Sequence, residues 1–95
     1  MEKNKIAVIG LGYVGLTFAI SLAKVGFKVL GIENNEKNFK SMVKGKAQFY
    51  EENIDKFLVK MQKNKRLKIQ SDLKDIHKFK IIFITLGTPI DNNKN

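Results

Sequence analysis

Short apolar runs alternate along the chain with segments whose apolar residues recur every three or four positions. The apolar runs have the length and β-branched or aromatic content of strands, and they cover 5–10, 27–32, 67–70 and 80–86. The periodic segments favour helices over 14–25, 35–44 and 53–64. Ser71 and Asp72 are good N-cap residues and predict one more brief helix over 72–78.

This alternation of strands and helices predicts an α/β fold built on a parallel sheet with right-handed crossovers. We expect a Rossmann-like, doubly wound sheet of about four strands with flanking helices. The last apolar run contains Ile81-Ile82-Phe83-Ile84, a continuous sequence suited to burial on both faces, yet no helical segment follows it. We therefore expect residues 1–95 to be the N-terminal part of a larger, truncated domain.

A glycine pattern follows the first predicted strand. Gly10, Gly12 and Gly15 fit Gly-x-Gly-x-x-Gly between that strand and the first helix, where a dinucleotide-binding turn is found. Gly10 permits the tight turn, Gly12 lets the backbone approach a pyrophosphate, and Gly15 lets the helix pack closely on the strand. The N–H groups at the start of the helix favour an anion. The alternative is a glycine-rich turn without a ligand.

An acidic residue lies where this motif requires one. Glu33 ends the second predicted strand, and a carboxylate there accepts hydrogen bonds from the ribose hydroxyls of adenosine. It repels a 2′-phosphate, so NAD is favoured over NADP, although the nearby Lys37 weakens that preference. Gly87 and Thr88 follow the fourth strand, which we expect to lie beside the first at the same crevice. They are further candidates for cofactor contact, or else part of a plain loop.

Length and composition narrow the chemistry available. The chain has 95 residues, no cysteine and one histidine, His77, so thiolate chemistry and a multi-histidine metal site are excluded within it. His77 is expected at the surface, without a catalytic role. No apolar run approaches the ~20 residues of a membrane span, so a soluble cytoplasmic protein is expected.

The net charge of +9 is compatible with a nucleic acid, an anionic membrane or a phosphate-bearing ligand. Arg66 is the only arginine among 18 basic residues, whereas bidentate recognition of bases and phosphates favours arginine. Basic residues run from Lys56 to Lys68 without an acid between them, and we interpret them as a solvated helix face. We therefore expect no nucleic-acid or membrane partner, and a basic binding module remains an alternative.

Four motifs in order resemble the UDP-glucose/GDP-mannose 6-dehydrogenase family. The segment 6–16, Ile-Ala-Val-Ile-Gly-Leu-Gly-Tyr-Val-Gly-Leu, is similar to the opening of these enzymes. Gly-Ile-Glu at 31–33 is similar to their Gly-x-Asp. Gly-Lys at 45–46, followed by Tyr-Glu at 50–51, is similar to a Gly-Lys and Glu-Pro-Gly-Leu segment, and Ile-Phe-Ile with Gly-Thr-Pro-Ile-Asp over 82–91 is similar to a strand and loop.

The resemblance implies a nucleotide-sugar dehydrogenase of polysaccharide biosynthesis that uses NAD to oxidise the C6 alcohol of a UDP- or GDP-sugar to a carboxylate. The implied cofactor-binding residues are Gly10, Leu11, Gly12, Tyr13, Val14, Gly15, Glu33, Leu86, Gly87 and Thr88. In the family the catalytic cysteine, lysine and general base, the sugar-nucleotide domain and the helix that makes the homodimer all lie downstream. No catalytic residue is expected in this chain, which alone is expected to be inactive. The 6-phosphogluconate and 3-hydroxyacyl dehydrogenases share the glycine loop and are alternatives.

Two features near this loop stay open. Glu52-Asn53-Ile54 replaces the family's Pro-Gly-Leu, so no role is carried over to the preceding Glu51. Tyr13 either borders the substrate side of the cofactor or covers the apolar end of its helix.

Overall fold

The computed structural model describes residues 4–85. Four strands and three α-helices alternate in the order β1 Lys5–Ile9, α1 Tyr13–Lys24, β2 Lys28–Ile32, α2 Glu36–Val43, α3 Ile54–Lys63, β3 Leu67–Gln70 and β4 Ile81–Ile84. Each lies within two residues of its expected bounds. None of the helices in the described part of the chain is long and apolar enough to span a bilayer.

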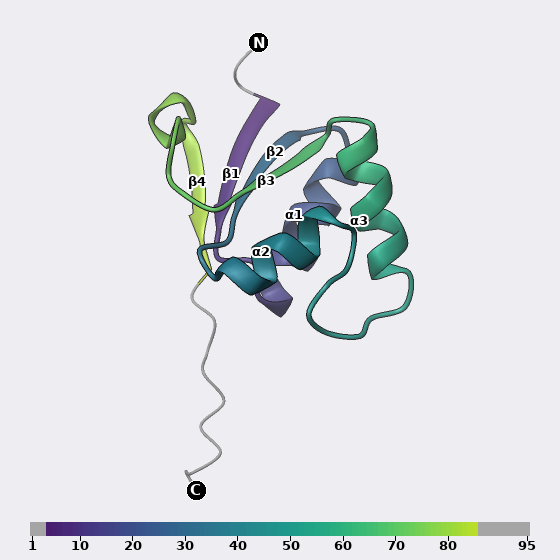
Figure 1. Cartoon of the computed structure of the whole chain (residues 1–95). Coiled ribbons are helices and arrows are strands. Elements are labelled where there is room, and N and C mark those ends of the chain that lie inside the picture. Colours follow the sequence, from purple (N-terminus) through teal and green to yellow (C-terminus); the bar gives the residue numbers. More distant parts are fainter. Residues whose placement is uncertain (1–3, 86–95) are drawn as a thin grey trace, which may run out of the picture.

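The four strands form one parallel sheet in the order β3-β2-β1-β4 (Figure 1). The chain runs outward from β1 to β3 and then returns to place β4 on the other side of β1. The expected Rossmann-like fold is therefore confirmed. The order reverses between β1 and β4, so the carboxyl ends of these two strands flank the position where ligands bind in open α/β sheets.

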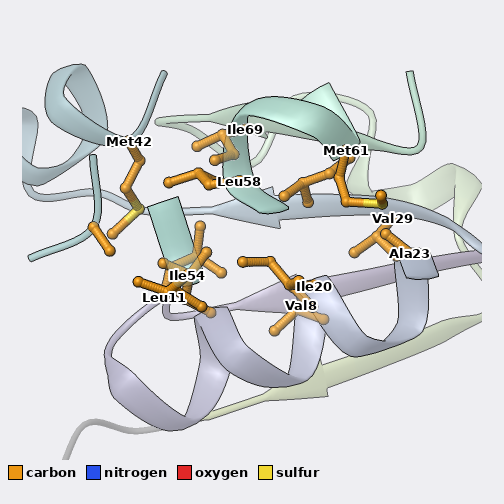
Figure 2. Packing of buried hydrophobic residues seen from close by; sticks show 14 of the residues in the cluster. Val8, Leu11, Ile20, Ala23, Val29, Met42, Ile54, Leu58, Met61 and Ile69 are labelled. Carbon is orange, nitrogen blue, oxygen red and sulfur yellow. The ribbon is translucent and has the colours of Figure 1, made fainter. Parts of the chain in front are cut away.

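The main hydrophobic core lies between the three helices and one face of the sheet (Figure 2). Val8 and Val29 contribute from the central strands, Leu16 and Ile20 from α1, and Leu58 from α3, and all are buried. The helices form because their apolar residues recur at helical spacing and can bury together on this face.

The opposite face of the sheet is covered only in part. Its smaller cluster contains Ala7, Leu30 and Ile32, with Ile76 and Phe79 of the β3–β4 connection packed against it. The apolar side chains of β4 are 40–65% exposed, although the ring of Phe83 meets that of Phe18 at a centroid distance of 4.8 Å. Among the described residues, burial of β4 on both faces is therefore not seen, because no helix lies on its second side.

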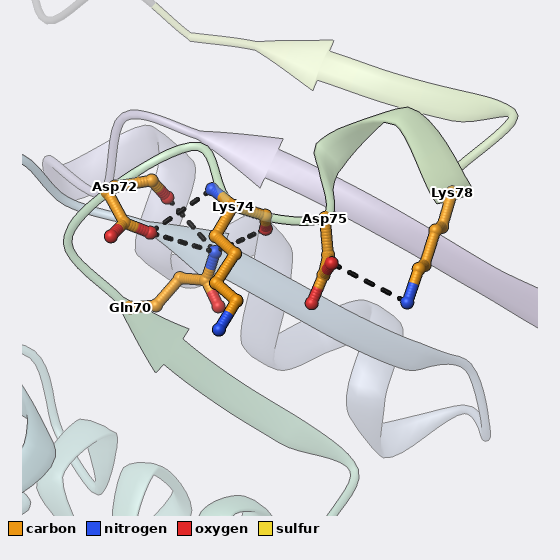
Figure 3. A network of polar contacts seen from close by, with 5 residues as sticks. All are labelled: Gln70, Asp72, Lys74, Asp75 and Lys78. Atoms are coloured by element: carbon orange, nitrogen blue, oxygen red, sulfur yellow. Dashed lines mark hydrogen bonds and ion pairs between the residues drawn. The ribbon is translucent and has the colours of Figure 1, made fainter.

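The expected helix over 72–78 is wrong. A single 3-10 turn, Ile76–Lys78, forms instead. The Asp72 carboxylate accepts the Lys74 N–H at 3.1 Å, which makes a local turn in place of a helix N-cap (Figure 3). The Gln70 amide donates to the carbonyls of Asp72 and Lys74 at 3.0 and 2.7 Å, and this bonding from outside the segment holds it in a non-helical path.

Candidate cofactor-binding site

The turn between β1 and α1 depends on Gly10. Its N–H donates to the carbonyl of Ile32 at 2.9 Å, which joins the turn to the end of β2. Gly10 has φ +93°, a conformation that favours glycine, and a Cβ there would collide with the backbone oxygen of Thr85. The Thr85 hydroxyl in turn donates to the Gly10 carbonyl at 2.6 Å. The turn is thereby held by the carboxyl ends of β2 and β4 together.

The other two glycines face opposite environments. A Cβ on Gly15 would strike the carbonyl oxygen of Gly10 and lie 2.6 Å from the Thr85 hydroxyl, so this glycine permits close packing of α1 on the turn. A Cβ on Gly12 would meet no described atom within 4 Å. The space in front of Gly12 is open, as the approach of a ligand to the backbone requires.

The amino end of α1 is left without a side-chain cap. Its N-cap residue is Gly12, and no described side chain accepts a hydrogen bond there. By contrast, the Asn35 side chain caps α2 by accepting the Asn38 N–H at 2.9 Å. Because the first N–H groups of a helix have no partner within it, the start of α1 presents donors and the positive end of a dipole to an anion.

Glu33 joins the turn to the end of β2. Its Oε1 accepts the N–H of Leu11 and its Oε2 accepts the N–H of Asn35, both at 3.1 Å. The residue is only 9% exposed. Each carboxylate oxygen retains acceptor capacity beyond its one backbone bond, so Glu33 can also receive ribose hydroxyls.

A hollow of about 360 Å³ opens beside this carboxylate at the carboxyl ends of β1, β2 and β4. Gly10, Glu33, Asp72, Leu73 and Thr85 are among its lining residues. An apolar wall next to an acidic group suits an adenosine, and the uncapped end of α1 suits a pyrophosphate. The described residues therefore fit NAD, with Glu33 toward the ribose and the turn toward the phosphates.

The predicted site residues have different surroundings. Leu11 turns its side chain into the core, where it is 1% exposed and packs over Gly31, so only its backbone is available to a cofactor. Val14 and Tyr13 are 64% and 55% exposed at the start of α1. Leu86, Gly87 and Thr88 lie outside the described residues, so their contacts stay predictions.

Glu51 was not among the predicted residues, yet the structure brings it to Tyr13. The Tyr13 hydroxyl donates to Glu51 Oε1 at 2.8 Å, and the tyrosine ring meets Phe49 edge-on at a centroid distance of 5.0 Å. The connection between α2 and α3 is thereby tied to the first turn of α1. The Tyr-Glu pair at 50–51, which matches the family motif, was the sequence signal for a role of Glu51. No role was assigned because the three residues that follow differ from the family's Pro-Gly-Leu.

The hydrogen bond to Glu51 raises the pKa of Tyr13 above its usual 10.0, and the negative charge and partial desolvation act in the same direction. A raised phenol pKa contributes stability that is present below pH 10 and is lost as the pH rises through the folded-state value. Expressed in a Tyr50→Phe background, Tyr13 should ionise above pH 10.0, and Glu51→Ala should return its pKa toward that value. Absorbance of tyrosinate during alkaline titration measures this, with Glu52→Ala as the control. An unchanged pKa in Glu51→Ala would show that the contact is not formed.

A parallel sheet with a glycine turn, an uncapped helix and an acid at the end of β2 defines a dinucleotide-binding α/β domain. The family model for the NAD-binding domain of the UDP-glucose/GDP-mannose dehydrogenase family matches residues 4–95. The chain therefore belongs to this family, and its cofactor is NAD.

Individual relatives agree with this assignment. The chain is 41% identical over 90 residues to an uncharacterized protein of Methanocaldococcus jannaschii, covering 95% of this chain and 10% of that protein. It is 36% identical over 88 residues to UDP-glucose 6-dehydrogenase TuaD of Bacillus subtilis, covering 92% and 19%. The solved UDP-D-ManNAc dehydrogenase of Pyrococcus horikoshii superposes with a TM-score of 0.84 at 32% identity, covering 93% and 21%. The chain thus spans 10–21% of the length of these relatives.

Proposed function

We propose that this chain is the NAD-binding portion of an enzyme that oxidises the C6 alcohol of a UDP- or GDP-sugar to a carboxylate. The observation that carries the proposal is the pairing of an uncapped α1 terminus with the Glu33 carboxylate at one hollow. When bound, NAD supplies the hydride acceptor. The sugar nucleotide, a homodimeric assembly and a cytoplasmic location belong to the same proposal, and they rest on the family membership.

The residues of this chain bind and orient the cofactor in this proposal. The first N–H groups of α1 hold the pyrophosphate, while Gly12 leaves room for it. Glu33 accepts the ribose hydroxyls and, through the Leu11 and Asn35 N–H groups, keeps the turn at a fixed distance from the end of β2. A 2′-phosphate beside this carboxylate is repelled, so NAD is preferred over NADP.

Glu33→Ala should weaken NAD binding by about 1–2 kcal/mol, as expected for lost hydrogen bonds to a charged acceptor. Isothermal titration calorimetry of NAD measures the effect. Because the substitution also leaves two backbone N–H groups without their acceptor, Glu33→Gln is a necessary companion: it keeps one carbonyl oxygen in place but removes the charge. A wild-type affinity in both variants would remove the ribose role from Glu33.

Glu36 is the matched control for loss of one negative charge. It lies in the first turn of α2, where its carboxylate pairs with exposed Lys40 at 3.6 Å. Glu36→Ala should leave NAD affinity within about twofold, since exposed ion pairs contribute little. NADP should bind more weakly than NAD to the wild type, and the difference should narrow in Glu33→Gln.

The alternative hypothesis, that this chain is a basic binding module, makes a different prediction. A nucleic-acid binder would bind DNA or RNA in a strongly salt-dependent manner and would show no thermal shift with NAD. NAD should instead raise the melting temperature of this protein, because any ligand that binds only the folded state does so. Tight, salt-sensitive nucleic-acid binding without any effect of NAD would overturn the proposed function.

A further inference from the structure

A second hollow lies on the sheet face opposite the three helices, near the amino ends of the strands. It has a volume of about 260 Å³. Its charged lining residues are Lys5, Lys28, Lys65, Lys68, Lys78 and Asp75. Five lysines thus surround one hollow with a single acid among the described residues that line it.

The strand register explains why these lysines converge. Lys5 of β1 lies directly across from Lys28 of β2, and Leu30 of β2 lies across from Lys68 of β3. Their neighbours Ile6, Val29 and Leu67 point into the main core, so the lysines point to the other face. Like charges that face each other across neighbouring strands are destabilising. Central strands of a parallel sheet ordinarily carry apolar residues on both faces.

The single acid of this lining already has a partner. The Asp75 carboxylate lies 3.5 Å from the Lys78 ammonium within the β3–β4 connection (Figure 3). The Gln70 amide holds the preceding part of that connection through the Asp72 and Lys74 carbonyls. The connection contributes Asp72 and Leu73 to the cofactor hollow and Asp75, Lys78 and Phe79 to this one, so it lies between the two.

The basic run between Lys56 and Lys68 divides into two groups in the structure. Lys56, Lys60 and Lys63 lie exposed on α3, and the last two are in its final turn, where a positive charge is favoured by the helix dipole. Lys65 and Lys68 instead line the hollow. The interpretation as a solvated helix face therefore explains the three lysines on α3. It does not explain Lys65 and Lys68.

We propose that this hollow binds a small, multiply charged phosphate anion. Several lysines around a compact space match the dense charge of such an anion, because an ammonium recognises phosphate as a point charge. The volume lies below the ~300–1,000 Å³ of pockets for drug-sized ligands, which favours a diphosphate group over a whole dinucleotide. The ring of Phe79, with Lys5 5.4 Å from its centroid, supplies an apolar wall.

Inorganic pyrophosphate is the first probe, titrated at low ionic strength with NAD present in excess so that the glycine turn is occupied. Backbone N–H chemical shifts locate the bound anion. The shifts should move around Lys28, Lys68 and Lys78, and the double variant Lys28→Gln/Lys68→Gln should weaken binding about tenfold, as expected for two exposed charge interactions. UDP is the second probe, because it distinguishes the two sources of a diphosphate group. If UDP binds more tightly than pyrophosphate, the ligand is a nucleoside diphosphate; if the two bind equally, the ligand is the free anion.

Lys56→Gln/Lys60→Gln is the matched control, since it removes the same charge from exposed positions on α3. It should change pyrophosphate affinity less than about twofold. In anion-free buffer the hollow variant should melt at or above the wild-type temperature, because it relieves like-charge repulsion and remains folded. Equal weakening by the two double variants, or shifts confined to residues 10–16, would overturn the proposal. If NAD does not bind, the proposed function is wrong but this proposal is still tested. The backbone N–H chemical shifts would still show where pyrophosphate binds.

Discussion

Gly15→Ala should lower the free energy of unfolding by about 1–2 kcal/mol. The added methyl would fall on the Gly10 carbonyl oxygen and 2.9 Å from its carbon, and these are backbone atoms that a rotamer change cannot move away. Overpacking of this kind costs about 1–3 kcal/mol and sometimes more. Alanine's higher helix propensity offsets about 1 kcal/mol of the loss. A net loss remains because α1 must shift off β1.

Urea unfolding of Gly15→Ala and wild type measures the difference. Ser21→Ala is the control, since Ser21 is exposed on the same helix and its substitution adds no atom near β1. That variant should remain within about 0.5 kcal/mol of wild type. If Gly15→Ala were as stable as the control, the close approach of α1 to the Gly10 carbonyl would be disproved.

The strands and helices could be predicted because their determinants are local. Apolar spacing identifies the core side of α1 and α3, and Gly26, at φ +115°, ends α1 as expected. The sheet order was also accessible, because a right-handed crossover from β1 to β2 and a glycine turn after β1 are typical of one topology. The glycine pattern and Glu33 predicted NAD, and the family motifs implied the same cofactor.

Contacts between distant segments could not be predicted in the same way. Tyr13 and Glu51 are 38 positions apart, and no local pattern shows that the α2–α3 connection returns to the start of α1. Arg66 was interpreted as part of a solvated basic run, whereas its Nη1 donates to the Ala23 carbonyl at 3.4 Å, where a cation is favoured at the end of α1. The wrong prediction of a helix over 72–78 has the same origin. Gln70, which lies in β3, donates hydrogen bonds to two backbone carbonyls of that segment.

Glu33 shows how one residue can be predicted correctly in position and incompletely in role. Its place at the end of β2 follows from the motif spacing. Its bond to the Leu11 N–H depends on the tertiary approach of two loops, and sequence spacing does not reveal it. The residue therefore stabilises the turn as well as facing the hollow, which is why its test needs both an alanine and a glutamine.

Gly12→Ala should abolish most NAD affinity while leaving the protein folded. Gly12 has φ −73° and ψ −160°, an extended conformation that alanine adopts, and its Cβ would meet no described atom. The methyl would instead occupy the space through which the pyrophosphate approaches the backbone. Losing one or two charge-assisted hydrogen bonds, at about 1.5–3 kcal/mol each, corresponds to a loss of affinity on the order of 10- to 10,000-fold.

Stability and affinity must be measured on the same sample, because the two glycine variants are expected to separate them. Gly12→Ala should keep the wild-type urea midpoint and lose the thermal shift with NAD. Gly15→Ala should instead have a lower urea midpoint than wild type. The difference arises because a Cβ at position 15 points into the protein, and one at position 12 points into open space. Retention of tight NAD binding by a folded Gly12→Ala protein would place the pyrophosphate elsewhere, and the uncapped start of α1 would then have no assigned anion.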